Sequence, residues 1–372
     1  MKKGQTAPED KGSRLSRRLH GPLTINDVAA HAGVSPMTVS RVINGEPNVR
    51  AAKREAVNAS IQALNYAPNP AARSLAGANV VRIGLLYSNP SEAYLSQFLL
   101  GSLDQCRRDH VQLVVEKCDI EGREAQVATR LAATGVDGVI LPPPLCDNDG
   151  VLKALAATNT PVVAVATGRE IPSVSTVRID DYDAARTMTR HLIEMGHHVI
   201  GFIKGHPNQT ASVQRHLGYL AAMKDGAAHP GDCPTTQGYF TYHSGLDATE
   251  HLLSASPRPT AIFASNDDMA AAAIAVAHRR GLEVPGDLTV CGFDDSERAR
   301  TIWPELTTIR QPITDMARRA VILLAEEIRG RRAGKAVGHV CDRVDFTLVR
   351  RQSDSPPSTQ RPPNLTAPCP KP

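Results

Sequence analysis

The stretch TINDVAAHAGVSPMTVSRVIN, from Thr24 to Asn44, constrains the fold of this chain more than any other part of it. Ile25, Val28 and Ala29 follow one another at i, i+3 and i+4, so they share one face of a helix. Thr24 is a residue type that caps a helix N-terminus, and an acidic residue three positions later completes a capping-box pattern. The stretch therefore begins with a short amphipathic helix.

A tight turn and a second helix follow in the same stretch. Gly33 is the residue type that ends a helix in a left-handed conformation. Ser35 caps the next helix, and Pro36 occupies its first turn, where a missing N–H is tolerated. In that helix Val39 and Val42 face inward, toward the first helix. This pattern predicts a helix-turn-helix.

The outer face of the second helix is small and polar, which a helix packed in a bundle does not require. In a helix-turn-helix, the second helix enters the DNA major groove by its N-terminal end. An αα-hairpin in a helical bundle explains the apolar residues but gives this outer face no role. We therefore predict a DNA-binding headpiece over residues 22–67. The residues of this headpiece expected at the DNA are Thr24, Ser35, Pro36, Met37, Thr38, Ser40, Arg41 and Asn44.

The segments after this motif carry a family resemblance. A third helix is predicted over VRAAKREAVNASIQALNY, with Val57, Ile61 and Leu64 at core spacing. The segment YAPNPAARSLAG comes next, from Tyr66 to Gly77. Taken with DVA, AGVS and TVSRVIN, it resembles the lactose-repressor (LacI/GalR) family of bacterial transcription regulators. A lone helix-turn-helix is a weak signal, whereas this series of motifs over one region is specific.

The resemblance implies a hinge helix between the headpiece and the rest of the chain, at residues 68–79. In the family this helix folds on the operator and inserts a leucine into the minor groove, which bends and widens the groove. Leu75 stands at that position here. Asn69 and Arg73 lie on the same segment and are expected at the DNA as well.

Positive charge is concentrated in the N-terminal region. Residues 1–79 hold 11 Lys and Arg against 5 Asp and Glu, whereas the whole chain has a net charge of +4. The remainder is therefore slightly acidic. Basic charge attracts phosphates and makes binding depend on salt. Residues 1–21, with Arg14, Arg17 and Arg18, are expected to form a disordered basic arm; a merely solvated tail fits them equally well.

After Gly77 the sequence has the pattern of an α/β domain. Short runs rich in Val and Ile alternate with segments of helical length, which indicates a parallel sheet covered by helices. The runs are VRIGLLY, VQLVVEKC, DGVIL, PVVAVAT, VIGFIKG, TAIFAS and LTVCGFDD. They are too many for one small sheet, so we expect two sheets and two lobes.

The resemblance gives the same fold class: an all-α helix-turn-helix headpiece followed by a two-lobed, periplasmic-binding-protein-like (type I), doubly wound sensor domain. This domain, which carries effector binding and dimerisation, is expected at 80–352. By this analogy lobe one comprises residues 80–179 and 308–352, and lobe two comprises 180–307. The segment 353–372 is rich in Pro and Ser, and is expected to be a disordered tail.

The effector site is expected in loops at the carboxyl ends of the strands, where parallel sheets bind ligands. These loops offer carboxylates, amides, a guanidinium and an aromatic ring, which together suit the hydroxyls and the C–H face of a sugar. The candidate effector-binding residues are Glu92, Tyr94, His206, Gln209, Arg215, Phe240, Asn266 and Asp294.

Several of these candidates have a structural alternative: Arg215 as an ion-pair partner, Phe240 as core and Asn266 as a turn residue. The resemblance assigns effector contact to the positions of Arg215, Asn266 and Asp294. Asp267 is most simply the N-cap of helix 268–281. Sugar-binding relatives often have an aspartate where this chain has an alanine after PVVAV, so one hydroxyl contact is in doubt.

Two other classes of protein fit the sequence less well. An α/β enzyme, for example one acting on glycosides, fused to a DNA-binding domain lacks support, because no GxSxG, P-loop or GxGxxG motif occurs. A periplasmic solute-binding protein accounts for the large domain but not for the basic headpiece or the missing signal peptide. Seven scattered cysteines show no metal-site spacing. We therefore expect no enzyme, no catalytic residues, no bound metal and no cofactor.

The resulting hypothesis is a DNA-binding transcriptional regulator, specifically a repressor controlled by a non-covalent effector, expected to be a sugar. One headpiece contacts too little DNA for high specificity, so a homodimer on a pseudo-palindromic operator is expected. No apolar run of about 18 residues is present, so no membrane association is expected. The expected location is the bacterial cytoplasm, at the nucleoid. The sequence leaves open whether the effector weakens or strengthens operator binding.

Overall fold

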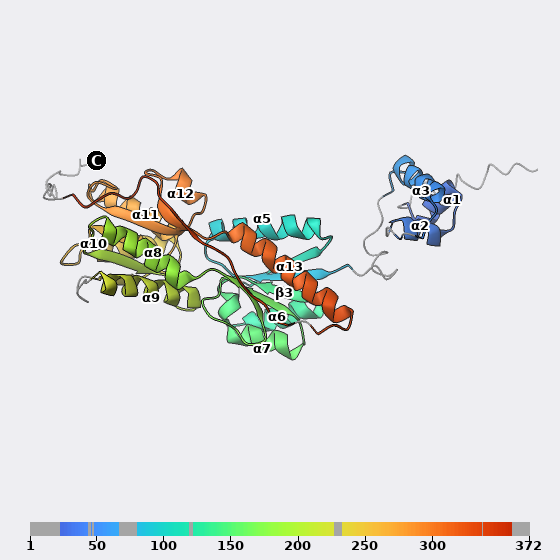
Figure 1. The fold of residues 1–372 in the computed structure, drawn as a ribbon, viewed down its shortest axis with the longest axis horizontal. Coiled ribbons are helices and arrows are strands. Elements are labelled where there is room, and N and C mark those ends of the chain that lie inside the picture. Colours follow the sequence, from blue (N-terminus) through green and yellow to red (C-terminus); the bar gives the residue numbers. More distant parts are fainter. Residues whose placement is uncertain are drawn as a thin grey trace, which may run out of the picture. The chain divides into compact units, whose positions relative to one another are not determined.

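A computed structural model describes residues 23–43, 46, 48–66, 80–118, 122–226, 233–336 and 338–358 of the chain. The chain divides into two compact units at Val80: the headpiece and the sensor domain (Figure 1). Among the described residues, no helix is long and apolar enough to cross a membrane. The headpiece is all-α, and the sensor domain is α/β, as predicted.

The headpiece consists of three helices around a small apolar core. The helices are α1 (Ile25–Ala32), α2 (Pro36–Ile43) and α3 (Ala51–Ala63). This confirms the predicted helix-turn-helix and the third helix. The side chains buried between the helices come from all three and from the segment that follows α3. They are Val28, Ala29, Val39, Val42, Val57 and Tyr66.

Local signals set the helix ends in the headpiece. The backbone N–H of Thr24 donates to Asp27 Oδ2 at 2.8 Å, which is half of the predicted capping box. Gly33 has φ 65°, the left-handed conformation that a C-cap needs. Ser35 Oγ accepts from the Thr38 N–H at 3.3 Å and so caps α2. The turn between the two helices is thus specified by its own residues.

Lobe one of the sensor domain is a six-stranded parallel sheet in the order β11-β5-β4-β3-β1-β2. Helices α5 and α13 pack against each other on one face, and α6 and α7 cover the other (Figure 1). Its elements are β1 (Arg82–Tyr87), α5 (Glu92–Arg108), β2 (Gln112–Lys117), α6 (Glu124–Ala133), β3 (Gly138–Leu141), η1 (Leu145–Asp147), α7 (Asp149–Ala157), β4 (Val162–Val165), β5 (Ser175–Arg178), α13 (Ile313–Arg332) and β11 (Cys341–Arg343).

Lobe two has a sheet in the order β12-β10-β9-β8-β6-β7, parallel except for β12. Helices α8 and α9 pack together, as do α10 and α11 (Figure 1). Its elements are α8 (Asp181–Glu194), β6 (Ile200–Lys204), α9 (Thr210–Asp225), β7 (Thr235–Gln237), α10 (Tyr242–Leu253), β8 (Ala261–Ala264), α11 (Asp267–Arg279), β9 (Thr289–Asp294), α12 (Arg298–Thr301), β10 (Thr307–Arg310) and β12 (Thr347–Val349).

The predicted lobe boundaries are wrong at the C-terminal side. Residues 308–352 were assigned to lobe one, but β10 and β12 belong to the sheet of lobe two. The chain therefore crosses between the lobes after β5, after β10 and again between β11 and β12. The strands β10, β11 and β12 are short, and the sequence of each is too brief to show which sheet it joins.

The predicted disordered tail also begins too early. Ser353 and Asp354 are buried in lobe two. Asp354 accepts from Thr307 Oγ1 at 2.6 Å and contacts His191 Nε2 at 2.7 Å. The segment 353–358 is thus packed, because polar side chains tie it down where apolar ones are few. The rest of the predicted tail, and the predicted N-terminal arm, lie outside the described residues.

Candidate DNA-binding face and effector pocket

The predicted DNA-reading face of α2 is open to solvent. Ser35, Pro36 and Met37 are exposed at its N-terminal end, and the Met37 side chain is 64% exposed although it is apolar. Thr38 and Ser40 are partly exposed on the same helix. An exposed methionine at the start of a recognition helix is available for apolar contact with a base edge.

The remaining predicted DNA residues divide into two groups. Thr24 and Arg41 are exposed, and Arg41 Nε lies 3.5 Å from the Glu46 carboxylate. This surface ion pair is weak and screened by salt, so phosphate can compete for the arginine. The other predicted residues lie outside the described part of the chain. They are Asn44, Asn69, Arg73 and Leu75.

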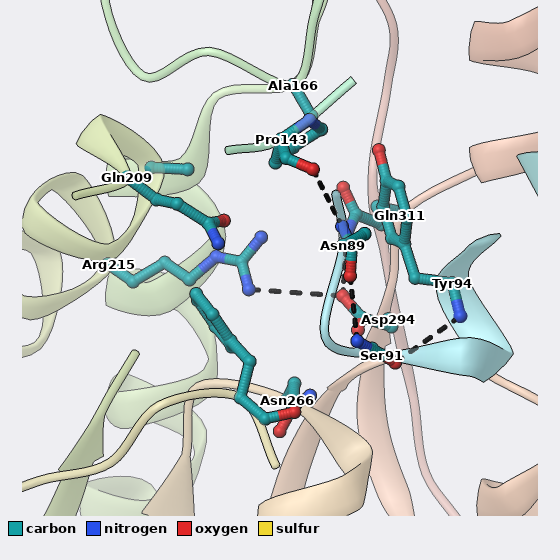
Figure 2. A pocket seen from close by; sticks show the side chains of 12 residues that line it. Asn89, Ser91, Tyr94, Pro143, Ala166, Gln209, Arg215, Asn266, Asp294 and Gln311 are labelled. Carbon is teal, nitrogen blue, oxygen red and sulfur yellow. Dashed lines mark hydrogen bonds and ion pairs between the residues drawn. The ribbon is translucent and has the colours of Figure 1, made fainter. Parts of the chain in front are cut away.

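A small pocket lies between the two lobes, at the carboxyl ends of their strands (Figure 2). Its free volume is about 30 Å³, which accommodates only one or two water molecules. Both lobes contribute to its wall, together with the crossover after β10. The lining residues are Asn89, Ser91, Tyr94, Pro143, Ala166, Gln209, Ala211, Arg215, Phe240, Asn266, Asp294 and Gln311.

Two of the predicted effector residues do not line this pocket. Glu92 is exposed in the first turn of α5, where an acidic side chain is favoured by the helix dipole, and is not part of the wall. His206 borders a wider opening beside the pocket and stands edge-on to Tyr239, with ring centroids 5.4 Å apart. The predicted effector residues that do line the pocket are Tyr94, Gln209, Arg215, Phe240, Asn266 and Asp294.

Arg215 is the central cation of the pocket, and it is already well partnered. Its Nε donates to Asp181 Oδ1 at 2.8 Å, and its Nη1 donates to the Ser265 carbonyl at 2.5 Å. The guanidinium carbon lies 3.6 Å from the centre of the Phe293 ring. The structural alternative for Arg215, a buried ion pair, is thus present in the fold. Its Nη1 also points to Asp294, with the two groups 3.9 Å apart (Figure 2).

Asp294 ends β9 with its carboxylate turned toward the pocket (Figure 2). Gln311 Nε2 donates to its Oδ1 at 2.5 Å. Burial raises the pKa of this carboxyl to about 7, against the lowering effects of Arg215 and the Gln311 hydrogen bond. Its φ of 114° lies in a region that residues other than glycine rarely adopt. Such strain at a strand end is typical of functional sites.

The adjacent Asp295 has a purely structural environment. Its side chain is 1% exposed and receives hydrogen bonds from Arg310 Nε at 2.6 Å and from Arg351 Nη2 at 2.5 Å. Although burial alone would raise it, the pKa of this carboxyl is lowered by the arginines. The two neighbouring aspartates therefore differ: one faces the pocket and the other fastens the C-terminal segment.

The N-cap of α11 is Asn266 and not Asp267, which corrects the sequence-based assignment. Asn266 Oδ1 accepts from the Met269 N–H at 3.0 Å, and its amide donates to the Phe240 carbonyl at 3.1 Å. Asp267 instead accepts from the Ser296 N–H at 2.7 Å. Asn266 thus combines the cap, the predicted turn role and a place in the pocket wall.

Two buried polar atoms of the pocket wall have no hydrogen-bond partner: Tyr94 Oη and Gln311 Oε1. A buried hydroxyl or carbonyl without a partner is costly, so each atom is available to a ligand. Sequence reasoning proposed Tyr94 but missed Gln311, as well as Ser91. Gln311 directly follows the short strand β10, which the sequence alone did not predict.

The comparisons with known proteins agree with both units of the chain. Residues 24–69 match the family model "Bacterial regulatory proteins, lacI family", and residues 189–353 match "Periplasmic binding protein-like domain". Catabolite control protein A of Priestia megaterium is 31% identical over 326 residues, which cover 87% of this chain and 98% of that protein. The chain belongs to the lacI family.

Other lacI-family relatives are similar over nearly their whole length. The transcriptional repressor PurR of Haemophilus influenzae (strain ATCC 51907 / DSM 11121 / KW20 / Rd) is 34% identical, over 89% of this chain and 98% of that protein. A Lac repressor dimer bound to operator superposes with a TM-score of 0.75 at 30% identity, covering 90% and 99% of the two chains. The transcriptional regulator CelR in complex with cellobiose superposes with a TM-score of 0.67 at 32% identity, and the match covers 89% of this chain and 100% of that chain.

Membership of the lacI family establishes the class of function. The chain is a DNA-binding transcriptional repressor whose periplasmic-binding-protein-like domain senses a small molecule. The predicted family and fold class are confirmed. The predicted residue roles at the DNA and in the pocket stay predictions.

Proposed function

We propose that the effector of this repressor is a small, neutral, polyhydroxylated molecule, a sugar, bound in the pocket between the lobes. The observation that carries the proposal is the pair of unpartnered atoms, Tyr94 Oη and Gln311 Oε1. The tyrosine hydroxyl can donate or accept a hydrogen bond, and the glutamine carbonyl oxygen can only accept one. A hydroxyl group can act both as donor and as acceptor, so the hydroxyls of one sugar can be partners for both atoms.

The charge balance of the pocket favours a neutral ligand. Arg215 is paired with Asp181 at 2.8 Å and lies 3.9 Å from Asp294. Desolvation raises the pKa of both carboxyls, so neither tolerates a further negative charge nearby. A phosphorylated or carboxylated ligand would meet no unpaired cation among the described lining residues. A sugar avoids this penalty and uses the polar atoms as hydrogen-bond partners.

The aromatic wall supports the same class of ligand. Phe240 lines the pocket and lies under Arg215, with the guanidinium carbon 5.8 Å from the ring centre. A ring of this kind can cover the C–H face of a pyranose while amides and carboxylates bind its hydroxyls. The cellobiose named with the relative CelR is in keeping with a sugar. The identity of the sugar for this chain is not implied by that relative.

A sugar needs more room than the pocket now offers. The free volume is about 30 Å³, and Ser91 of lobe one donates to Asp268 of lobe two at 2.8 Å beside it. Entry of a pyranose therefore requires the lobes to move apart. Sugar binding and the arrangement of the two lobes are therefore coupled. Binding shifts the lobes relative to each other, and with them the N-terminal end of lobe one, to which the headpiece is joined in the chain.

We also propose that the repressor acts as a homodimer on a pseudo-palindromic operator. Three large apolar side chains are exposed along one side of the sensor domain: Leu100 at 64%, Leu103 at 52% and Trp303 at 76%. The first two lie on α5, and Trp303 follows α12; Gln97 of α5 and Arg300 of α12 line one surface depression. Figure 1 shows both helices along the same edge. Large apolar side chains that are exposed on one side of a domain favour an interface there.

The proposal includes no catalytic step and no bound metal. Asp294 and Asp295 are adjacent in sequence, but Asp295 is held by arginines away from the pocket. They cannot work on opposite sides of one bond. The relatives are regulators, which supports a sensing role for the pocket.

The test is a thermal-shift and calorimetric screen of the full chain with glucose, galactose, ribose, cellobiose and lactose, with glucose 6-phosphate and hypoxanthine as comparisons. We expect at least one unphosphorylated sugar to raise the Tm and to change the affinity for an operator selected from a random DNA library. The Tyr94→Phe variant should bind that sugar at least fivefold more weakly while its own Tm is equal to or above that of the wild type. A response to hypoxanthine or to the phosphate ester alone would refute a neutral sugar effector.

A further inference from the structure

A second contact between the two lobes is made by a buried carboxylate. Asp147 ends η1 in lobe one, and its side chain is 2% exposed. Its Oδ2 accepts from the backbone N–H of Thr210 at 2.8 Å, and its Oδ1 accepts from Thr210 Oγ1 at 2.8 Å. Thr210 is the first residue of α9 in lobe two. The two lobes are therefore connected by a bidentate, charge-assisted contact.

The contact caps the N-terminus of α9, which has no side-chain cap from its own N-cap residue. Gln209, the N-cap residue of α9, makes no capping hydrogen bond with its side chain. The first N–H groups of a helix need partners, and a negative charge is favoured beside them. Asp147 supplies both from the other lobe. Helix α9 of lobe two is thus capped by a residue of lobe one.

The backbones of the two lobes also touch at this point. The Gly168 N–H of lobe one donates to Thr210 Oγ1 at 2.8 Å. A Cβ atom at Gly168 would lie 2.6 Å from both the carbonyl carbon and the oxygen of Thr210. Only glycine allows this approach. The contact therefore depends on a particular residue type in each lobe.

The other groups around Asp147 belong to lobe one. Thr167 Oγ1 donates to its Oδ1 at 2.8 Å, and Arg169 Nε lies 3.8 Å from the same oxygen. Arg169 is itself paired with the exposed Asp149 at 2.7 Å. These partners hold the carboxylate in place within lobe one whether or not lobe two is present against it.

We infer that Asp147 is a positioning residue of the sensor: by capping α9 across the cleft, it holds the lobes closed and fixes the pocket wall that α9 provides. Gln209, Ala211 and Arg215 all stand on the first two turns of α9 or directly before it, and all line the pocket. The position of this wall relative to lobe one is then set by Asp147. The inference does not depend on the chemical class of the effector.

The geometry predicts that opening of the cleft breaks this contact as a unit. When the lobes part, the Thr210 N–H loses its acceptor, Asp147 Oδ2, and the Gly168 N–H loses its acceptor, Thr210 Oγ1. The two bonds break together although the two N–H groups belong to different lobes. Asp147 need not touch the effector to affect its binding. It changes how often the lobes are closed, and with that the apparent affinity for an effector that enters only when the lobes part.

Hydrogen exchange measured on the ligand-free full chain tests the inference. In Asp147→Ala we expect the amides of Thr210 and Gly168 both to exchange at least tenfold faster than in the wild type. The Thr210 amide loses its acceptor directly, whereas the Gly168 amide keeps its acceptor and is exposed only if the lobes part. Asp147→Asn retains an acceptor for the Thr210 N–H and should restore most of the protection. Asp149→Ala, which removes a neighbouring exposed carboxylate, is the matched control and should leave both amides protected.

A second variant approaches the same contact from the opposite side. In Gly168→Ala the added methyl group collides with Thr210, so the Thr210 amide should lose protection even though Asp147 is intact. Protection of Gly168 that survives in Asp147→Ala would mean that Asp147 is only a local cap. Equal effects of Asp149→Ala and Asp147→Ala would also overturn the inference. A Tm close to that of the wild type shows that the variants are folded.

Discussion

At the scale of single residues, the pocket is defined by charges that are buried and only partly compensated. Asp294 faces Arg215 at 3.9 Å, and the two are not in hydrogen-bond contact. Asp181 lies closer, with its Oδ1 2.8 Å from Arg215 Nε, so it neutralises most of the charge of the guanidinium group. The protein thereby keeps a carboxyl group at the pocket with its charge poorly stabilised. That arrangement makes Asp294 the group most sensitive to pH among those lining the pocket.

The raised pKa of Asp294 should make the free energy of unfolding of the sensor domain depend on pH. Burial raises the pKa of Asp294 to about 7 in the folded state, whereas the pKa of an aspartate in the unfolded chain is near its ordinary value of 3.8. Between these two values the folded state binds the extra proton, so the free energy of unfolding falls as the pH rises, by up to about 1.4 kcal/mol per pH unit. Urea denaturation of the wild type and of Asp294→Asn from pH 4 to pH 8 measures the difference.

Asp294→Asn cannot lose a proton, so its stability relative to the wild type should increase with pH until about pH 7 and then level off. Asp295→Asn is the comparison at the adjacent position. The pKa of Asp295 is lowered by arginines, so its removal should destabilise the protein above pH 4. A constant difference between the wild type and Asp294→Asn at every pH would contradict the assignment.

Single residues were predictable where the sequence neighbours decide their surroundings. Asp294 is the last residue of one buried strand and Asn266 lies two residues past another, so their place at the pocket could be predicted from the strand-end rule. Gln311, Ser91 and Asp147 could not be selected in this way. Their partners lie 17, 177 and 63 positions away in the chain. The pairing of β10 with β9 brings Gln311 to Asp294, whereas Ser91 and Asp147 reach their partners only through the crossovers between the lobes.

At the scale of elements, α2 is the part whose sequence and structure agree most closely. Its start follows from the left-handed Gly33, which ends α1, and from Ser35, which caps α2; its buried side follows from the spacing of Val39 and Val42. The strands of the sensor domain with four or more apolar residues were also predictable. The three-residue strands β7, β11 and β12 were not, because so short a segment owes its conformation to the sheet it joins.

The open face of α2 leads to a prediction about base preference. Met37→Ala should change which operator bases are selected, because the side chain is 64% exposed at the end of the helix that enters the groove. Arg50→Ala should only weaken binding, and should reduce its dependence on salt, because an exposed arginine at the start of α3 serves phosphates. Selection from a randomised DNA library measures the first effect, and titration at several salt concentrations measures the second. A uniform loss of affinity for all sequences with Met37→Ala would show that this residue does not read bases.

At the scale of the whole molecule, two of the groups of exposed apolar residues on the sensor domain differ in the elements that they cover. Leu100, Leu103 and Trp303 span both lobes, whereas Val213 and Leu217 lie on α9 alone. A surface shared by both lobes can respond when the lobes move against each other. This is the property that a dimer interface needs if it is to carry a signal from the pocket to paired headpieces.

The first group should therefore be the dimer interface. Leu103→Asp should convert the dimer to a monomer in sedimentation experiments and should lower operator affinity, because paired half-sites are no longer bound together. Leu217→Asp places the same charge on the other apolar surface and should leave the dimer intact. Trp303 is the only tryptophan of the chain, so its emission should shift to longer wavelength when dilution separates the protomers. A monomeric Leu217→Asp beside a dimeric Leu103→Asp would reverse the assignment.

The late position of β11 and β12 in the chain has a consequence for biosynthesis. The headpiece is complete once Tyr66 has emerged from the ribosome, because all of its core residues precede that point. Neither sheet of the sensor domain can be finished until residues 341–349 have been made. Domains generally fold as units while synthesis proceeds. A nascent chain thus carries a folded DNA-binding domain well before it can respond to an effector, and a stop codon that removes β12 would leave a headpiece without a working sensor.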